Sequence, residues 1–209
     1  MFTGKIYGKW MAATQREKLE KILEEVGIKN IEGKNILDVG SGPGFLSAIL
    51  RKSQKSGSVV SSDIDIVNLK MHENLRFSAC RKSCRFSCKA SGLKVLASGD
   101  FLPFGKVFDV VFCIDAIHLL DKKRIGAEFA KVLKDSGILV VSAFCNKYTS
   151  DGKMKELEEA LRGFEIKKRF LAKTENEWDA VVVASLNNMK DNKYYANSPS
   201  NQKLFLSET

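Results

Sequence analysis

The stretch Ile36-Leu-Asp-Val-Gly-Ser-Gly-Pro-Gly-Phe45 decides the fold of this chain. It begins with apolar residues typical of a buried strand and continues into glycines at alternate positions, Gly40, Gly42 and Gly44. Glycines at such a turn adopt positive φ and let a ligand approach the backbone closely, because no Cβ stands in the way. Residues 45–53 then have the length and periodicity of a helix. The pattern predicts a ligand-binding turn at one end of an α/β sheet.

The spacing of the glycines separates this turn from two other nucleotide-binding motifs. A dinucleotide-binding G-x-G-x-x-G needs its third glycine where Phe45 stands. A phosphate-binding P-loop continues into Gly-Lys-Ser/Thr, which does not follow here. A nicotinamide-dependent oxidoreductase is therefore only a distant alternative.

Apolar and polar segments alternate along most of the chain, as in a parallel sheet whose two faces are covered by helices. The expected strands are residues 35–39, 58–64, 94–99, 108–114 and 137–144. The expected helices are residues 45–53, 65 to about 90, 117–134 and 154–161. Two further strands, 164–172 and 178–186, are joined by a short polar connection and predict an antiparallel hairpin at the sheet edge.

The two ends of the chain differ from this pattern. Thr14, with Glu17 three residues later, resembles a capping box, and the apolar stripe that follows predicts an amphipathic helix over 14–26. We therefore expect an N-terminal cap segment and helix in residues 1–30 and one ligand-binding domain in 31–186. Residues 187–209 are polar and are expected to form a disordered tail.

Composition limits the class of protein. The 209 residues are 44% hydrophobic and 28% charged, which is ordinary for a globular domain. No run of about 18 apolar residues occurs, and the N-terminus lacks a secretory h-region, so we expect a cytoplasmic protein without a membrane span and with its 5 cysteines reduced. The net charge of +9 is compatible with a polyanionic partner, but a solvated basic surface is the favoured interpretation. The sequence leaves the oligomeric state open.

Carboxylates stand at the expected ends of three successive strands. Asp63 ends the second strand about 20 residues after the turn, Asp100 ends the third, and Asp115 stands at the end of the fourth. Because ligands of open α/β sheets bind outside the carboxyl ends of the strands, these side chains are expected to face one crevice.

With these residues in place, the sequence resembles the class I S-adenosylmethionine-dependent methyltransferases, which implies a Rossmann-like fold and this cofactor. Within this family, the sequence most resembles the subgroup that contains quinone-type and other small-molecule methyltransferases. The resemblance spans residues 35–186 and rests on motifs in order: Leu37-Asp-Val-Gly-Ser-Gly-Pro-Gly44, residues 59–64, Gly99-Asp-Phe-Leu-Pro-Phe104, Phe108-Asp-Val-Val-Phe-Cys-Ile-Asp-Ala-Ile-His-Leu-Leu120 and Phe129-Ala-Lys-Val-Leu-Lys-Asp-Ser-Gly-Ile-Leu-Val-Val141.

The resemblance implies which residues hold the methionine part of S-adenosylmethionine. The turn of Gly40, Gly42 and Gly44 underlies that part of the cofactor, and Asp38 orients the turn. The backbone at Ile114 faces the methionyl amine.

The resemblance also implies the nucleoside contacts. Asp63 holds the ribose hydroxyls and Ile64 packs on the adenine. Asp100 takes the adenine amino group, and Phe101 flanks the ring.

The acceptor side departs from the family at two places. Asp135-Ser136-Gly137 replaces the usual Pro-Gly-Gly turn, and Leu119 replaces the second of two common histidines. His118 is the candidate general base, because imidazole titrates near neutrality, although a residue packing beneath the pocket is the alternative. Asp115 is the second catalytic candidate, or it helps to hold the methionyl amine.

Two aromatic residues stand before the predicted first helix, in a segment that folds over the pocket in the resembling family. Tyr7 and Trp10 are expected either to contact the acceptor and exclude water or to fasten the helix to the domain.

One helical stripe carries three thiols. Cys80, Cys84 and Cys88 are spaced i, i+4 and i+8, which fits a buried helix face better than a metal site, because structural zinc usually takes four ligands. No metal is therefore expected. The stripe is surrounded by basic residues: Arg76, Arg81, Lys82, Arg85 and Lys89.

The function predicted from the sequence is transfer of a methyl group from S-adenosylmethionine to a small-molecule acceptor by in-line displacement. RNA, for example a tRNA base, is the alternative acceptor, because of the net charge and the basic cluster. A protein that binds the cofactor without transferring the methyl group is a third possibility.

Overall fold

The chain is described from a computed structural model that covers residues 4–27, 31–53, 56–72, 92–175 and 177–187, with the side chains of residues 4–13 and 53 outside the description. The strands are β1 (Asn35–Val39), β2 (Ser58–Asp63), β3 (Leu93–Leu96), β4 (Phe108–Cys113), β5 (Leu133–Cys145), β6 (Phe164–Lys173) and β7 (Trp178–Leu186). The helices are α1 (Gly4–Val26), α2 (Phe45–Ser53), α3 (Ile66–Met71), the 3₁₀ turn η2 (Ile117–Leu119), α4 (Ile125–Val132) and α5 (Ser150–Ala160).

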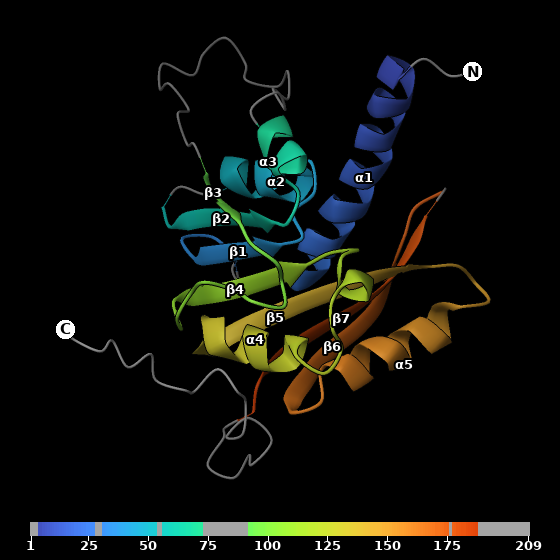
Figure 1. Ribbon diagram of the computed structural model, residues 1–209. Helices are drawn as coiled ribbons and strands as arrows, with labels where there is room; N and C mark the ends of the chain where they lie inside the picture. Colours follow the sequence, from blue (N-terminus) through green and yellow to red (C-terminus); the bar gives the residue numbers. More distant parts are fainter. Residues whose placement is uncertain (1–3, 28–30, 54–55, 73–91, 176, 188–209) are drawn as a thin grey trace, which may run out of the picture.

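Seven strands form one sheet in the order β3-β2-β1-β4-β5-β7-β6 (Figure 1). Strands β1 to β5 pair in parallel, whereas β7 is antiparallel to both β5 and β6. This confirms the predicted seven-stranded, mostly parallel sheet with an antiparallel C-terminal hairpin. Within that hairpin β6 forms the edge of the sheet, and β7 lies inside it.

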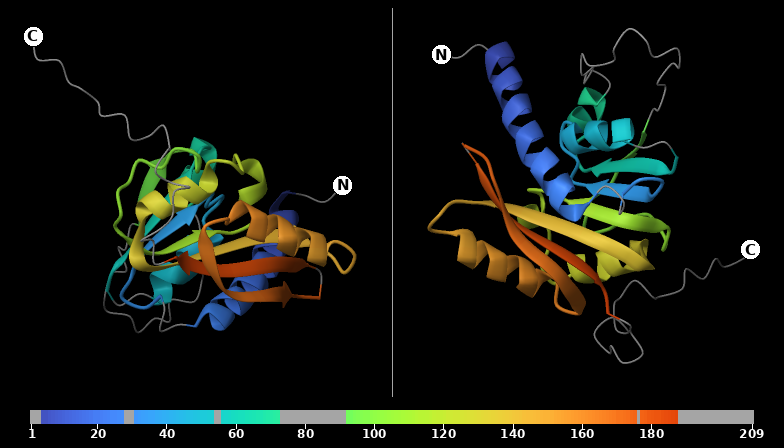
Figure 2. Two further views of the ribbon diagram at one scale, coloured as in Figure 1. Left: turned by 90° about the horizontal axis from the view of Figure 1, so that it is seen from below. Right: turned by 180° about the vertical axis from the view of Figure 1, so that it is seen from behind.

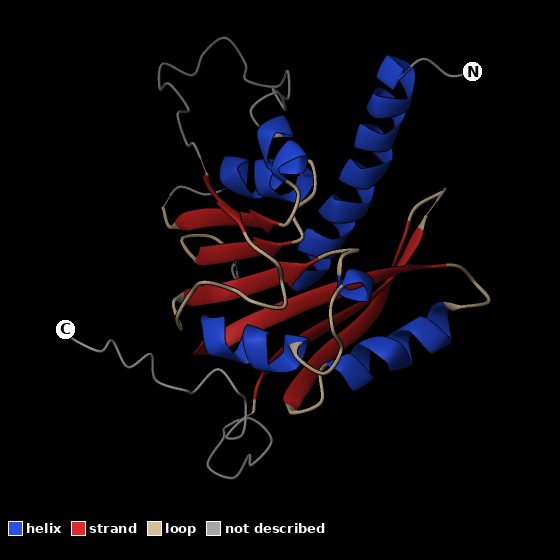
Figure 3. Cartoon of the chain, in the orientation of Figure 1, coloured by secondary structure: helices blue, strands red, loops and turns tan. Residues whose placement is uncertain are grey.

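Helices cover both faces of the sheet, as expected (Figures 2 and 3). On one face, α1 and α2 pack against alternate strand residues such as Ile36, Val110 and Val140. On the other face, α4 and α5 pack against the intervening residues, such as Leu37 and Val111. Each central strand is therefore apolar on both sides, which explains its continuous hydrophobic run.

The first helix is longer than predicted. Helix α1 begins at Gly4, so Thr14 is not its N-cap but a buried residue within it. The capping-box pattern was misleading because nothing between residues 4 and 13 stops a helix, and a Ser or Thr inside a helix is tolerated where tertiary packing supports it.

Several boundaries of the central elements also differ. Strand β3 ends at Leu96, so Asp100 lies in the loop after the strand and does not end it. The segment 117–134, expected to be one helix, is η2 followed by α4, and β5 already begins at Leu133.

The departure at residues 135–137 therefore falls inside β5, where the pairing with β4 shifts register. The prediction of a turn at these residues is therefore wrong. Helix α5 begins at Ser150, four residues before the expected start.

Other predictions fall partly or wholly outside the described residues. Only α3 is described from the expected helix 65–90, and the cysteine stripe and its basic neighbours in 76–89 lie outside the description. The same holds for the tail from residue 188. No helix in the described part of the chain is long and apolar enough to span a bilayer.

Candidate functional site

The glycine turn follows β1 at the carboxyl end of the parallel strands. Gly40, Gly42 and Gly44 have φ values of 66°, 52° and 91°, as predicted from their spacing. A Cβ on Gly40 would lie 2.4 Å from Cβ of Ala116, and one on Gly44 would lie 2.6 Å from the His72 ring. A Cβ on Gly42 would meet nothing within 4 Å. Gly40 and Gly44 are thus required for internal packing, whereas Gly42 presents an open backbone face.

Asp38 lies beneath the turn in β1 and is buried. Its carboxylate accepts a hydrogen bond from the Ser47 hydroxyl at 2.6 Å, and Ser47 lies in α2, directly after the turn. Burial raises the pKa of Asp38 to about 6, although the Ser47 hydrogen bond opposes this shift. Asp38 therefore ties the strand before the turn to the helix after it.

Asp63 ends β2 and faces the same turn. Its carboxylate accepts the Gly42 amide at 2.7 Å and the Asp65 amide at 2.8 Å. Beside it, the Ile64 side chain is 75% exposed, so an apolar surface is open next to a carboxylate. This pair combines hydrogen-bond acceptors with exposed apolar surface.

Asp100 and Phe101 lie in the loop after β3. The Asp100 carboxylate accepts the Asp121 amide at 2.8 Å, which joins this loop to the segment after η2. Phe101 is 59% exposed, and the Arg124 guanidinium lies 4.2 Å from its ring centroid. The structure thus places a second exposed apolar side chain after the strand that neighbours β2.

Ile114 and Asp115 directly follow β4. Asp115 is the one described non-glycine residue with positive φ, at 54°. Its amide donates a hydrogen bond to the Ser142 hydroxyl at 3.2 Å. Such backbone strain persists only where the surroundings impose it.

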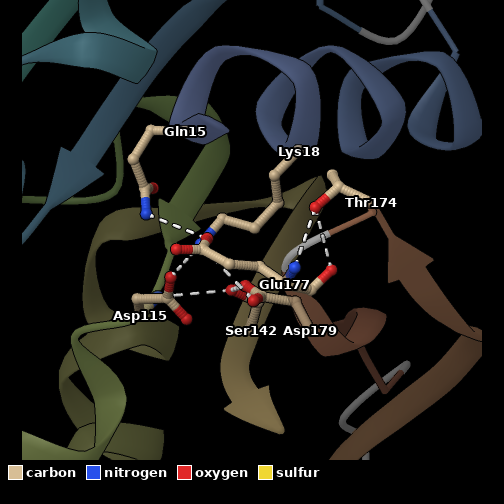
Figure 4. Close-up of polar contacts among 7 residues, drawn as sticks. All are labelled: Gln15, Lys18, Asp115, Ser142, Thr174, Glu177 and Asp179. Carbon is tan, nitrogen blue, oxygen red and sulfur yellow. Dashed lines mark hydrogen bonds and ion pairs between the residues drawn. The ribbon is translucent and has the colours of Figure 1, made fainter. Parts of the chain in front are cut away.

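A buried lysine from α1 supplies those surroundings (Figure 4). The Lys18 side chain is 1% exposed, and its ammonium contacts the Asp115 carboxylate. The same ammonium lies 3.3 Å from Glu177 and 3.4 Å from Asp179, while the Ser142 hydroxyl donates to Asp179 at 2.8 Å. The Lys18 cluster, meaning Lys18, Asp115, Ser142, Glu177 and Asp179, therefore joins α1 to the ends of β4 and β7.

The Lys18 cluster holds more negative than positive charge. Burial disfavours the ammonium, but the three carboxylates outweigh it and raise the pKa of Lys18. Burial and the neighbouring Asp115 carboxylate raise the pKa of Asp179 to about 7. The cluster therefore holds a proton on its carboxylates near neutral pH.

His118 lies apart from this cluster. It is exposed in η2 and lines a pocket with residues of α5, among them Lys153 and Glu156. Within the described residues, no hydrogen bond or ion pair links His118 to Asp115. The structure does not join the two catalytic candidates in one network.

Tyr7 and Trp10 fall within α1, but their side chains lie outside the described part of the structure. Their contact with an acceptor stays a prediction.

Sequence reasoning missed Lys18, His72, Glu177 and Asp179. One signal was present for two of them. Lys18 stands four residues before Ile22 and eight before Val26, on the apolar stripe of α1, and Asp179 interrupts the apolar run of β7. Opposite charges on two buried faces indicate an ion pair. His72 carried no comparable signal.

Known proteins that are similar to this chain are methyltransferases. The profile of a family described as "Methyltransferase domain" matches residues 30–198. The chain is 30% identical over 153 residues to a malonyl-[acyl-carrier protein] O-methyltransferase of Geobacter sulfurreducens, which covers 72% of this chain and 52% of that protein. The chain thus spans about half the length of that relative.

Solved structures show the same fold. A SAM dependent methyltransferase from Aquifex aeolicus superimposes with a TM-score of 0.65 at 20% identity, covering 90% of this chain and 100% of the other. A magnesium protoporphyrin IX methyltransferase from Synechocystis with bound SAM gives 0.59 at 16% identity, covering 83% and 80%. The fold of this chain is therefore Rossmann-like.

Proposed function

The chain belongs to the methyltransferase-domain family and is an S-adenosylmethionine-dependent methyltransferase, and from this premise we propose that it methylates a small-molecule acceptor. The acceptor class is supported by the named relatives, and the observation that carries the cofactor site is the open face of Gly42, on a turn whose other two glycines are packed against the protein. It is the one position of the turn where the structure leaves room for a ligand against the backbone.

The residues around the turn fit S-adenosylmethionine. Gly42 leaves space for the methionine part. The Asp63 carboxylate accepts two backbone amides and the Asn68 side-chain amide, and its remaining acceptor capacity suits ribose hydroxyls. Ile64 and Phe101 expose apolar surface suited to the adenine. When bound, S-adenosylmethionine supplies a methyl group on a sulfonium, and its in-line displacement leaves S-adenosylhomocysteine.

We assign Asp115 a binding role at the methyl-transfer end of the site. Lys18 contacts its Oδ2, and a hydrogen bond with Asp115 helps to raise the pKa of Asp179, so the cluster holds the Asp115 carboxylate in place. The Asp115 side chain is 27% exposed at the end of β4, which favours a hydrogen-bond donor or a positive charge on the bound molecule. His118 stays the candidate base for acceptors that must lose a proton.

Two comparisons support a small acceptor. One relative is a malonyl-[acyl-carrier protein] O-methyltransferase, and one structural neighbour is a magnesium protoporphyrin IX methyltransferase. RNA is the alternative acceptor because the chain has a net charge of +9. The basic cluster of the chain at 76–89, which also motivates this alternative, lies outside the described residues. A cytoplasmic location stays a prediction from the sequence.

Transfer of label tests the acceptor class. The purified chain is incubated with S-adenosyl[methyl-³H]methionine and a cell extract separated into metabolites, protein and RNA. We expect label in the metabolite fraction, or in a protein-bound acyl group that hydroxylamine releases from its thioester. Label in ribonuclease-sensitive material, label that stays on the polypeptide, or no transfer to any fraction would contradict the proposal.

A variant with Val at position 42 controls for other methyltransferases in the extract. Its branched side chain fills the open face of the turn, so transfer that persists with Gly42→Val at the wild-type rate does not come from this site.

A further inference from the structure

The backbone of Gly42 is held through both its N–H group and its carbonyl group. Its N–H donates to Oδ2 of Asp63 at 2.7 Å, and its carbonyl oxygen lies 2.8 Å from Nε2 of His72. Asp63 comes from the end of β2, and His72 is the C-cap residue of α3. Two elements thus fix the orientation of the residue whose outer face is open.

His72 is built into the turn as a packing partner as well. It is 7% exposed, and its ring occupies the space that a Cβ on Gly44 would need, at 2.6–2.7 Å. Any residue with a Cβ at position 44 would clash with the imidazole of His72. The turn and the histidine therefore form one packed unit.

The geometry defines the protonation of the imidazole. A carbonyl oxygen only accepts hydrogen bonds, so Nε2 carries the hydrogen in the bond to Gly42. Nδ1 is buried and has no hydrogen-bond partner among the described residues. Protonating Nδ1 would create a buried, unpaired donor, which is costly.

On balance, the surroundings of the ring lower the pKa of His72 and so also favour its neutral form. Burial lowers the pKa of His72, the Gly42 carbonyl and Asp63 oppose this, and Arg51 of α2 and Lys94 of β3 lower it further. The neutral ring is therefore the form that holds the turn at neutral pH.

We propose that His72 is a positioning residue of the cofactor site: with Asp63 it clamps the Gly42 peptide and presents the open face of the turn in a fixed orientation. The inference rests on the proposed placement of S-adenosylmethionine at this turn. Preorganisation of this kind lowers the ordering cost of binding, so its loss is measurable as affinity.

Two substitutions separate the clamp from simple packing. His72→Gln keeps an amide N–H that reaches toward the Gly42 carbonyl, whereas His72→Leu fills similar space without a donor. We expect His72→Leu to weaken S-adenosylhomocysteine binding in calorimetry by about three- to tenfold, the size of one hydrogen bond, and His72→Gln to stay within about twofold of the wild type. Thermal unfolding without ligand checks that each variant is folded.

A pH series supplies a readout that packing alone does not move. Wild-type affinity should fall relative to that of His72→Gln as the pH drops below 6.5, the ordinary pKa of histidine, because a proton on Nδ1 makes a buried, unpaired donor and favours conformations in which the ring leaves the Gly42 carbonyl. This ratio also decides the matter if His72→Leu does not fold. The clamp would be overturned if both His72 variants bound as tightly as the wild type or lost affinity equally. It would also be overturned if the ratio of wild-type to His72→Gln affinity did not change with pH. Absence of binding by the wild-type chain would instead contradict the proposed function.

Discussion

Gly42 and Gly33 offer a matched pair at the residue scale. Both have positive φ, 52° and 72°, but Gly42 follows β1 at the proposed site, whereas Gly33 precedes β1 at the opposite end of the strand. A Cβ on Gly33 would meet only the flexible Ser56 hydroxyl, at 3.2 Å. We expect alanine at either position to cost about 1 to 2 kcal/mol of stability, because of the left-handed backbone.

Only Gly42→Ala should also affect binding. Its Cβ would stand where the cofactor approaches, so S-adenosylhomocysteine affinity should fall on the order of tenfold or more, while Gly33→Ala binds as the wild type does. Calorimetry and urea unfolding measure the two effects. Equal affinities in both variants would place the ligand elsewhere.

Residues of the site were predictable from the sequence where local pattern determines them. The glycine turn and Asp63 follow directly from a strand that ends in a recognisable motif. His72 was not predictable, and Lys18 was predictable only as a buried charge and not by its contact with Asp115, because Gly42 and Asp115 lie 30 and 97 residues away from them. Only the folded chain shows that these groups meet.

At the element scale, Lys18 fastens α1 to the sheet. Removing one partner of a buried ion pair leaves charge uncompensated, so Lys18→Met should lower the free energy of unfolding by about 3 to 5 kcal/mol. Lys21→Met on the same helix is the control, because the Lys21 side chain is 41% exposed and its partners, Glu17 and the Lys173 carbonyl, are exposed as well. It should change stability by no more than about 0.5 kcal/mol.

Removing an opposing charge should restore part of the loss. The double variant Lys18→Met/Asp179→Asn leaves one fewer buried carboxylate and should be more stable than Lys18→Met alone. Urea unfolding measures all four proteins. A small effect of Lys18→Met, or no recovery in the double variant, would contradict the charge balance assigned to the cluster.

The same cluster predicts a pH dependence. The pKa of Asp179 is raised from 3.8 to about 7, so the folded chain binds a proton that the unfolded chain has already lost between these values. This contribution to stability is complete below about pH 4 and is lost as the pH rises through about 7. Asp179→Asn should therefore flatten the stability profile between about pH 5 and about pH 7, as measured by unfolding in a buffer series. An unchanged slope would show that other groups cause it.

The strands of the sheet were easier to predict than the helix boundaries. Central strands such as β1 and β7 are short runs buried on both faces, so their limits coincide with the ends of the apolar run. Helix ends depend on packing as well as caps. Between η2 and α4, Asp121 accepts the Lys123 amide, a cap-type signal that the prediction of one helix over 117–134 did not use.

At the scale of the whole molecule, the order of the strands gathers the site. Strand β1 lies between β2 and β4, so the segments carrying Gly42, Asp63 and Asp115 leave neighbouring strands at one edge. Helix α1 then reaches this edge through Lys18. The sequence predicted the number and direction of the strands, but it did not predict that the N-terminal helix is bound to the site by a buried charge.

Calorimetric titration of the wild-type chain with S-adenosylmethionine, S-adenosylhomocysteine and NAD tests the central claim most directly. The glycine spacing and the open Gly42 face predict that both sulfur nucleotides bind and that NAD does not. Binding of NAD, with no heat from either sulfur nucleotide, would contradict the account.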